Sequence, residues 1–275
     1  MISRSGVMRR GFVLPGWLLR WEALLILLLF LASAVNASLS PYFLDIRNLF
    51  DMTFNFMERG LIALTMALII ISGNIDLSVA SNLAMSAILM GVIHRAGWNI
   101  WLAVLLGLTV GALGGMLNGL LIAKVRLPAL VVTLGTYALY RGIAFVVLGD
   151  QAVTKFPSEF TYLGQGYIPG TPVPVPLVLF AVFAIVYGLL LHRTTFGRFV
   201  YAIGSNEEAC RYSGVNIDRI KITLFTLSGL MSALAGMILA ARFGSVRPNI
   251  AMGFELEVIT TVVLGGVDIF GGRGT

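Results

Sequence analysis

The chain has 275 residues, of which 58% are hydrophobic and only 12% are charged. A soluble domain carries about 25% charged residues, so a single soluble core would not bury this much apolar surface, whereas a lipid bilayer would. The net charge of +6 would suggest nucleic-acid binding in a soluble chain. Here we assign it to membrane orientation, because basic residues stay on the cytoplasmic side.

Eight apolar stretches follow one another along the chain, and we predict an all-α polytopic membrane protein with about eight transmembrane helices. The predicted spans are residues 23–39, 60–72, 79–93, 98–123, 127–148, 177–191, 222–241 and a last one that begins near residue 256. Residues 1–22 are predicted to form a cytoplasmic segment, and residues 23–275 the transmembrane domain. The second stretch has only 13 residues. It must borrow residues from before Glu58 or be one limb of a broken helix.

Two polar loops separate the later spans. In the first, residues 149–176, the prolines at 169, 172, 174 and 176 forbid a regular helix. The second, residues 193–221, is the longest. With a cytoplasmic N-terminus and eight crossings, eleven basic residues lie inside and six outside, which places 193–221 in the cytoplasm. The chain stops after a glycine-rich stretch, so we expect a truncated reading frame or fragment that lacks C-terminal spans.

The best site candidate is the polar interruption at Gly73–Ser78. Asn74, Asp76 and Ser78 alternate along it, so an extended backbone would point them the same way. Broken helices near the bilayer midplane are a recurring way to build transporter sites. The alternative is a short cytoplasmic turn in which Asp76 or Ser78 caps the next helix. Both interpretations stay open, since a turn below the membrane surface would satisfy each of them.

Other intramembrane polar residues are weaker candidates. We take Asn118, Thr133 and Thr136 as further pathway residues, although a Thr hydroxyl often bonds back to its own helix. Arg141 is either held in a structural ion pair or lines a pore. Asn118 sits beside a face of glycines that repeats every four residues and that we assign to helix packing. These glycines are Gly107, Gly111, Gly115 and Gly119.

Residues 204–210 in the long loop predict a short helix. Ser205 or Asn206 could cap it, Glu207 and Glu208 suit its first turn, and Gly214 fits a C-terminal cap. This segment either docks on a soluble partner as a helix or is a loop exposed to solvent.

Catalysis and metal binding find no support in the sequence. The glycines of residues 266–271 lack the Lys-Ser/Thr of a P-loop, and His94 and His192 form no metal cluster. Cys210, the single cysteine, excludes an internal disulfide.

The segment Ser72–Ser81 resembles the Gly-Gly-Ile-Asp-Leu-Ser-Val-Gly signature of sugar-import permeases. These are membrane subunits of bacterial ATP-binding-cassette importers of the ribose, xylose and autoinducer-2 group. Further segments match in order: 118–119, Pro128 with 133–136, 196–198 with 201–207, 264–266 and 271–275. Within this group the chain looks most like the rhamnose permeases, on residues 40–45, 53–56, 147–152 and 255–258.

The resemblance implies an inner-membrane permease, with a cytoplasmic N-terminus, that imports a monosaccharide, here rhamnose. It implies two ATPase subunits, a periplasmic sugar-binding protein and a second permease copy or paralogue as partners. ATP is then used by the partner, and this chain needs no cofactor or metal. Family members usually continue past the glycine-rich segment with further spans.

The resemblance also assigns roles to residues. Asn74, which replaces a common glycine, lies with Asp76 and Ser78 on the substrate path. Glu207, Glu208, Ala209 and Gly214 match the motif that docks into the ATPase, with Cys210 in place of the usual second alanine.

A different transport class would also place Asp76 in the membrane. An ion-coupled secondary transporter of a small polar solute would do so without an ATPase partner, and its uptake would survive ATP depletion.

Overall fold

A computed structural model describes residues 21–274, which form two units divided after Leu49. The first unit contains α1 (Trp21–Leu39) and the start of α2 (Ile46–Thr53), joined by a turn in which the backbone N–H of Arg47 donates to Asp45 Oδ1 at 2.8 Å. The first predicted span is therefore helical. Of the predicted cytoplasmic segment 1–22, residues 1–20 lie outside the described residues, and the last two begin α1.

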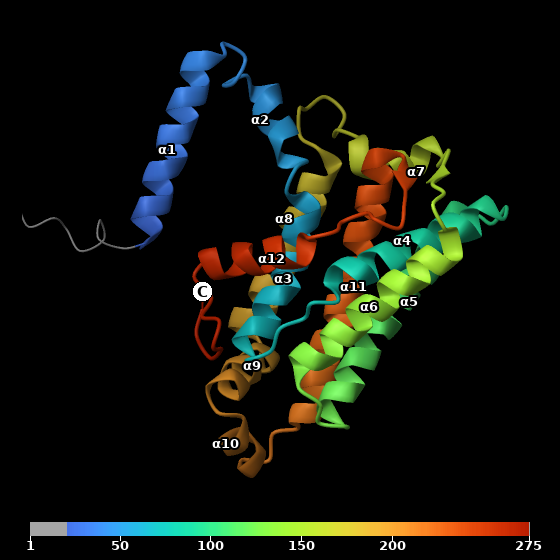
Figure 1. The fold of residues 1–275 in the computed structure, drawn as a ribbon. Helices are drawn as coiled ribbons and strands as arrows, with labels where there is room; N and C mark the ends of the chain where they lie inside the picture. The colour runs from blue at the N-terminus through green and yellow to red at the C-terminus, as the bar shows by residue number, and fades with distance from the viewer. Residues whose placement is uncertain (1–20, 275) are drawn as a thin grey trace, which may run out of the picture. The chain divides into compact units, whose positions relative to one another are not determined.

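The second unit is built from helices, which confirms the all-α prediction for the described residues (Figure 1). Its helices are α3 (Met57–Ile71), α4 (Val79–Arg95), α5 (Ile100–Ala123), α6 (Ala129–Leu148), α7 (Ser158–Gln165), α8 (Val175–Arg193), α9 (Thr195–Ser205), α10 (Glu207–Tyr212), α11 (Ile217–Phe243) and α12 (Phe254–Leu264). Two short strands, β1 (Val153–Thr154) and β2 (Ser245–Val246), pair antiparallel.

Four helices in the described part of the chain are long and apolar enough to cross a bilayer: α5, α6, α8 and α11. A fifth candidate is the pair α2 and α3, bent by 51° at their junction. Two shorter apolar stretches are Ala23–Leu39 within α1 and Val79–Arg95, which is α4, and α12 has 11 residues. At 1.5 Å per residue α12 covers only about 16 Å, too little to span the hydrocarbon core. The structure thus supports a polytopic protein, and the eight crossings stay a prediction.

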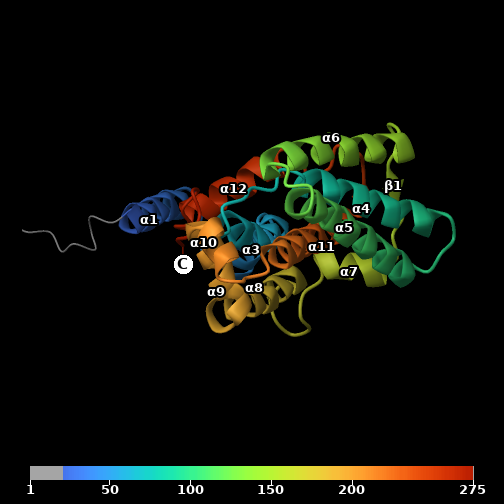
Figure 2. The ribbon, with the colours of Figure 1, turned by 90° about the horizontal axis from the view of Figure 1, so that it is seen from below.

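The core of the second unit lies around α11, which packs against α3, α4, α5 and α7. Figure 2 shows α6 on one side of this core and α8 with α9 on the other. Helices α5 and α11 approach closely, and a Cβ added to Gly115 would lie 2.1 Å from the carbonyl oxygen of Phe225. A Cβ on Gly111 would meet the Ala233 side chain at 2.4 Å. The predicted packing role of the α5 glycines is confirmed.

The two polar loops contain more structure than the sequence indicated. In the first, α7 packs on the end of α11, and Gln165 Nε2 donates to the carbonyl oxygens of Ala241 and Arg242. The proline-rich stretch is irregular up to Pro174, as predicted. The prediction is wrong for Pro176, which lies in the first turn of α8 (from Val175), where a proline is tolerated. In the second, α9 was not predicted, whereas α10 is the expected short helix.

Replacing Gly115 with Leu should disrupt the second unit, because the side chain would enter the backbone of α11 and overpacking costs about 1–3 kcal/mol or more. The measurement is the melting temperature of the purified protein in detergent. Gly142→Leu is the matched control, since a Cβ at Gly142 on α6 would meet nothing within 4 Å. Equal melting temperatures for the two variants would contradict the packing assignment.

Candidate functional site

The helical conformation is interrupted between α3 and α4, at the polar segment where the sequence predicted a break. Helix α3 ends in a Schellman motif, in which Gly73 adopts a left-handed φ of 77°. The Gly73 N–H donates to the carbonyl oxygen of Ile70 at 2.8 Å, and the Asn74 N–H to that of Ile69 at 3.1 Å. Helix α4 then begins at Val79. The chain between the two helices is non-helical. Its backbone N–H and carbonyl groups lie among packed helices, and lipid would offer them no hydrogen-bond partners.

Asp76 is buried at this break and holds three elements together. Its Oδ1 accepts the N–H of Ser78 at 2.9 Å and the Ser78 hydroxyl at 2.6 Å. Its Oδ2 accepts the hydroxyl of Ser228 on α11 at 2.8 Å. Asn118 Nδ2 on α5 donates to Ser78 Oγ at 2.8 Å, so α5 joins the same network. We call Asp76, Ser78, Asn118 and Ser228 the Asp76 network.

Helix α4 has no side-chain cap from its N-cap residue Ser78, and a place on a substrate path stays a prediction for Asp76. Its carboxylate accepts a backbone N–H just before the first turn of α4, where a negative charge complements the helix dipole. It also lies in the interior, 1% exposed, bonded to a helix that is distant in sequence. One buried side-chain atom of the network lacks a hydrogen-bond partner in the described part of the chain. Asn118 Oδ1 is buried without a hydrogen-bond partner among the described residues.

The remaining predicted pathway residues are placed differently. Asn74 is half-buried, and its Nδ2 donates to the carbonyl oxygen of Ser72 at 3.0 Å. Thr133 Oγ1 makes a long contact of 3.4 Å with the carbonyl oxygen of Ile75. Thr136 bonds back to its own helix, at 3.1 Å to the carbonyl oxygen of Val132. The break thus brings together Asp76, Ser78 and Asn118, with Thr133 at its edge and Thr136 outside it.

Arg141 is buried and donates to backbone carbonyl oxygens rather than to a carboxylate. Its guanidinium reaches Pro248 at 2.6 Å and Ile250 at 2.9 Å, both after β2, and Ala80 on α4 at 3.3 Å. These contacts fasten the segment between β2 and α12 to the start of α4.

A second set of contacts joins the break to α9 and to the C-terminal glycine-rich stretch. The carbonyl oxygen of Ile71, the last residue of α3, accepts the N–H of Gly272 at 2.8 Å. A Cβ on Gly204, in the last turn of α9, would lie 1.8 Å from the same oxygen. A Cβ on Gly271 would lie 2.8 Å from Gly73. Only glycines permit this approach of three backbones.

Helix α10 follows α9 directly and is capped at both ends. Asn206 Oδ1 accepts the N–H of Ala209 at 2.9 Å, which fixes the cap among the two predicted candidates. Gly214, with φ of 78°, closes a second Schellman motif, in which the Val215 N–H donates to the carbonyl oxygen of Cys210 at 3.1 Å. Cys210 is buried, whereas the other side of the helix is exposed. The exposed residues of α10 are Glu208, Ala209, Arg211 and Tyr212, the last at 90% exposure.

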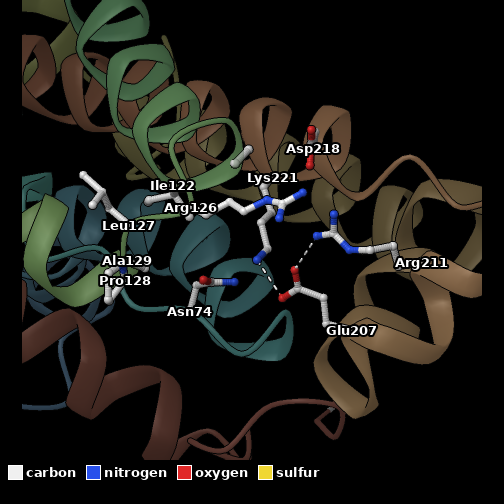
Figure 3. A pocket seen from close by; sticks show the side chains of 11 residues that line it. Asn74, Ile122, Arg126, Leu127, Pro128, Ala129, Glu207, Arg211, Asp218 and Lys221 are labelled. Carbon is white, nitrogen blue, oxygen red and sulfur yellow. Dashed lines mark hydrogen bonds and ion pairs between the residues drawn. The ribbon is translucent and has the colours of Figure 1, made fainter.

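A charged cavity of about 290 Å³ lies between the break and α10 (Figure 3). Asn74, the end of α5, the start of α6, α10 and the start of α11 line it. Lys221 Nζ pairs with Glu207 Oε2 at 2.7 Å, and Arg211 with Glu207 Oε1 at 3.3 Å. At its edge Lys124 pairs with Asp218 at 3.0 Å. Glu207 is therefore not a free docking residue but the centre of an ion-pair group.

A larger cavity of about 520 Å³ lies between α3, α8 and α12. Its lining is mainly apolar, with residues such as Ala63, Leu64 and Phe180. Its polar residues are Arg59, Tyr187, His192, Glu257 and Thr261, and Arg59 pairs with Glu257 at 2.7 Å. Among residues 21–274, no group of three His, Cys, Asp or Glu side chains is placed to hold a metal ion. The candidate polar site is therefore the break together with the adjacent charged cavity.

Sequence reasoning missed Ser228 and Lys221. Ser228 lies 152 positions from its partner Asp76 and Lys221 lies 14 from Glu207. The one available signal was the run of small residues on α11, Ser228-Gly229 and Ser232-Ala233, which suits a helix that faces the α5 glycines.

Comparison with known proteins identifies a family. Residues 48–272 match the family described as "Branched-chain amino acid transport system / permease component". The "Autoinducer 2 import system permease protein LsrD" of Klebsiella pneumoniae is 38% identical over 263 residues, 94% of this chain and 79% of that protein. The "Ribose import permease protein RbsC" of Bacillus subtilis is 38% identical over 248 residues, 90% of this chain and 76% of that protein. No solved structure matches the chain.

The chain belongs to this permease family, which confirms the resemblance to importer permeases of the ribose and autoinducer-2 group. It is a transport component rather than an enzyme. Permeases of such importers work with ATPase subunits and a periplasmic sugar-binding protein. These two relatives are named for autoinducer 2 and ribose. The finer assignment to rhamnose stays a prediction.

Ser228→Ala should lower the melting temperature of the purified protein by several degrees, because Asp76 Oδ2 would lose its donor inside the core. A buried acceptor without a partner costs about 1–3 kcal/mol. Ser232→Ala is the control, since Ser232 lies one turn further along α11, is equally buried, and has a hydroxyl oxygen with no partner among the described residues. A loss of stability as large in Ser232→Ala as in Ser228→Ala would argue against the Asp76 network.

Proposed function

We propose that this permease-family chain is the membrane-spanning subunit of an ATP-driven importer of a monosaccharide. In this proposal residues 193–221 face the cytoplasm, the N-terminus lies on the same side, and a partner subunit binds and hydrolyses ATP. A second copy or a paralogue completes the pathway, and a periplasmic binding protein delivers the sugar. The proposal includes eight crossings, with the short helices α1, α4 and α12 contributing to them.

One observation carries the proposal: an exposed capped helix is joined by short contacts to a broken helix in the interior. α10 presents Glu208, Ala209 and Tyr212 to the outside, while Gly204, at the end of the adjoining α9, packs on the last carbonyl of α3. An importer driven by a separate ATPase needs such a connection between its docking surface and its interior. An ion-coupled transporter has no use for it.

The Asp76 network supplies the part that changes state. We infer that Asn74, Asp76, Ser78, Asn118 and Thr133 shape the substrate path, with Thr136 one turn further along α6 from Thr133. In the present conformation, Asp76 and Ser78 satisfy each other and are closed to solute. Displacement of α3 or α11 would separate Ser228 from Asp76 and expose groups that bind hydroxyls. A helix that is bonded in two alternative arrangements is a suitable two-state element.

The sugar is the least determined part of the proposal. Rhamnose follows from the finer sequence resemblance, whereas the relatives are named for ribose and for autoinducer 2. All three are compact polyhydroxylated solutes, and the proposal is therefore stated for this class, with rhamnose as its first member to test.

Uptake in vesicles that carry the assembled transporter should require ATP inside and should persist after an uncoupler removes the proton gradient. The measurement is accumulation of radiolabelled rhamnose, ribose and an amino acid outside the class, each with its own binding protein, against vesicles without the ATPase. Uptake that survives ATP depletion and stops with the uncoupler would instead identify the ion-coupled alternative. Accumulation of ribose but not rhamnose would retain the importer and correct its substrate.

Gly214→Val should uncouple ATP hydrolysis from uptake, because a β-branched residue at a φ of 78° would break the C-terminal cap of α10. The expected result is uptake lowered at least about tenfold with ATPase activity retained. Gly214→Asn is the control, since Asn tolerates the left-handed conformation and open space surrounds the position. Normal uptake in Gly214→Val would remove the α10 end from the coupling surface.

A further inference from the structure

The ion pair between Glu207 and Lys221 differs from the other ion pairs around the charged cavity. The Lys221 side chain is only 11% exposed, whereas Lys124 and Arg211 in the neighbouring pairs are 61% and 47% exposed. Exposed ion pairs contribute little to stability, but removing one partner of a buried pair leaves an uncompensated charge. In the Lys221 pair the lysine is mostly buried and Glu207 is 39% exposed, so loss of Glu207 leaves a mostly buried ammonium group without its counter-charge.

The partner of Lys221 does not come from its own helix. Helix α11 begins at Ile217, and Lys221 lies just beyond its first turn, which contains the acidic residue Asp218. Its ammonium group is held by a carboxylate that belongs to a different helix.

The pair also joins two helices that have separate tasks in the proposed function. Glu207 is the first residue of α10, which carries the exposed docking residues, and Lys221 stands two turns before Ser228 on α11. Figure 3 shows both side chains reaching across the cavity toward each other, with Asn74 of the break beside them. A rigid displacement of α10 away from α11 would break this contact first and would leave the buried ammonium group facing the cavity.

We propose that Glu207 and Lys221 form a releasable latch that holds α10 against α11 until the ATPase partner moves α10. This inference rests on the proposed function and names the regulation of the same site. Lys221 is a positioning residue: it touches no solute and acts through Glu207 on the docking helix. With the latch closed, the break keeps its closed hydrogen-bond network. With the latch open, α10 and α11 move independently, and ATP can be hydrolysed without a delivered sugar.

The test uses the complete transporter in proteoliposomes, with ATPase activity measured with and without sugar-loaded binding protein. Lys221→Met removes the charge and keeps the apolar stem, and Glu207→Gln removes the carboxylate at a more exposed position. Both variants should raise the ATPase activity without binding protein about fivefold or more, the lower end of typical coupling between sites, and should reduce the stimulation by loaded binding protein. Lys221→Arg should restore the wild-type ratio, because the charge and the pair are kept.

A matched control separates the latch from a general effect of charge near the cavity. Lys124→Met breaks the pair that holds the α5–α6 turn to α11. It should keep the wild-type stimulation ratio. If Lys221→Met and Glu207→Gln behave like this control in a transporter that couples ATP to uptake, the latch is refuted and the proposed function stands.

Two other outcomes are also decisive. If Lys221→Met fails to assemble, as judged by its melting temperature and its yield with the ATPase, Glu207→Gln alone decides between the latch and its absence. If the wild-type complex does not couple ATP hydrolysis to uptake, the proposed function fails and the latch fails with it.

Discussion

The structure depends on how one broken helix satisfies its backbone inside a membrane protein. Between Ile71 and Val79 the chain leaves the helical conformation, and its N–H and carbonyl groups find no partner in lipid. Three kinds of contact replace the missing helical bonds. The Schellman motif at Gly73 closes the end of α3, Asp76 accepts the N–H at the start of α4, and Gly272 donates to the carbonyl oxygen of Ile71. The break is thus a bonded structure and not a flexible joint.

These contacts differ in which part of the chain supplies the bonded partner. The turn at Gly73 and the Asp76–Ser78 bonds are local and move with the break. The others come from elements that a partner protein could displace, because α9 and the glycine-rich stretch 265–274 surround Ile71 and α11 supplies Ser228. A shift of α9 or α11 would therefore change the bonding of the break. Helices α9 and α11 therefore connect the proposed docking surface directly with the break in the interior.

Local and periodic signals in the sequence predicted much of this. The polar interruption indicated the break, the four-residue spacing of glycines indicated close packing against a neighbouring helix, and Ser205 or Asn206 with Gly214 indicated a capped helix. Each signal depends on neighbours along one helix. Ser228 and Lys221 escaped because their partners lie on other helices, and a serine or a lysine in α11 looks the same whether or not a carboxylate faces it. The same limit hid the partners of Arg141, which are carbonyl oxygens that carry no side-chain signature.

As part of the proposed substrate path, the closed Asp76 network also bears on how the sugar is selected. A hydroxyl that replaced Ser78 or Ser228 at Asp76 would exchange one hydrogen bond for another, and such exchanges contribute only about 0.5–1.5 kcal/mol. Asn118 Oδ1 is the exception, because it is a buried acceptor with no partner among the described residues. It would gain a full bond from a solute hydroxyl once the network opens. The network is therefore suited to reporting that a polar solute is present, and only weakly suited to telling one monosaccharide from another. Discrimination between sugars then belongs to the separate protein that delivers them, which would let relatives with different named substrates share the same break.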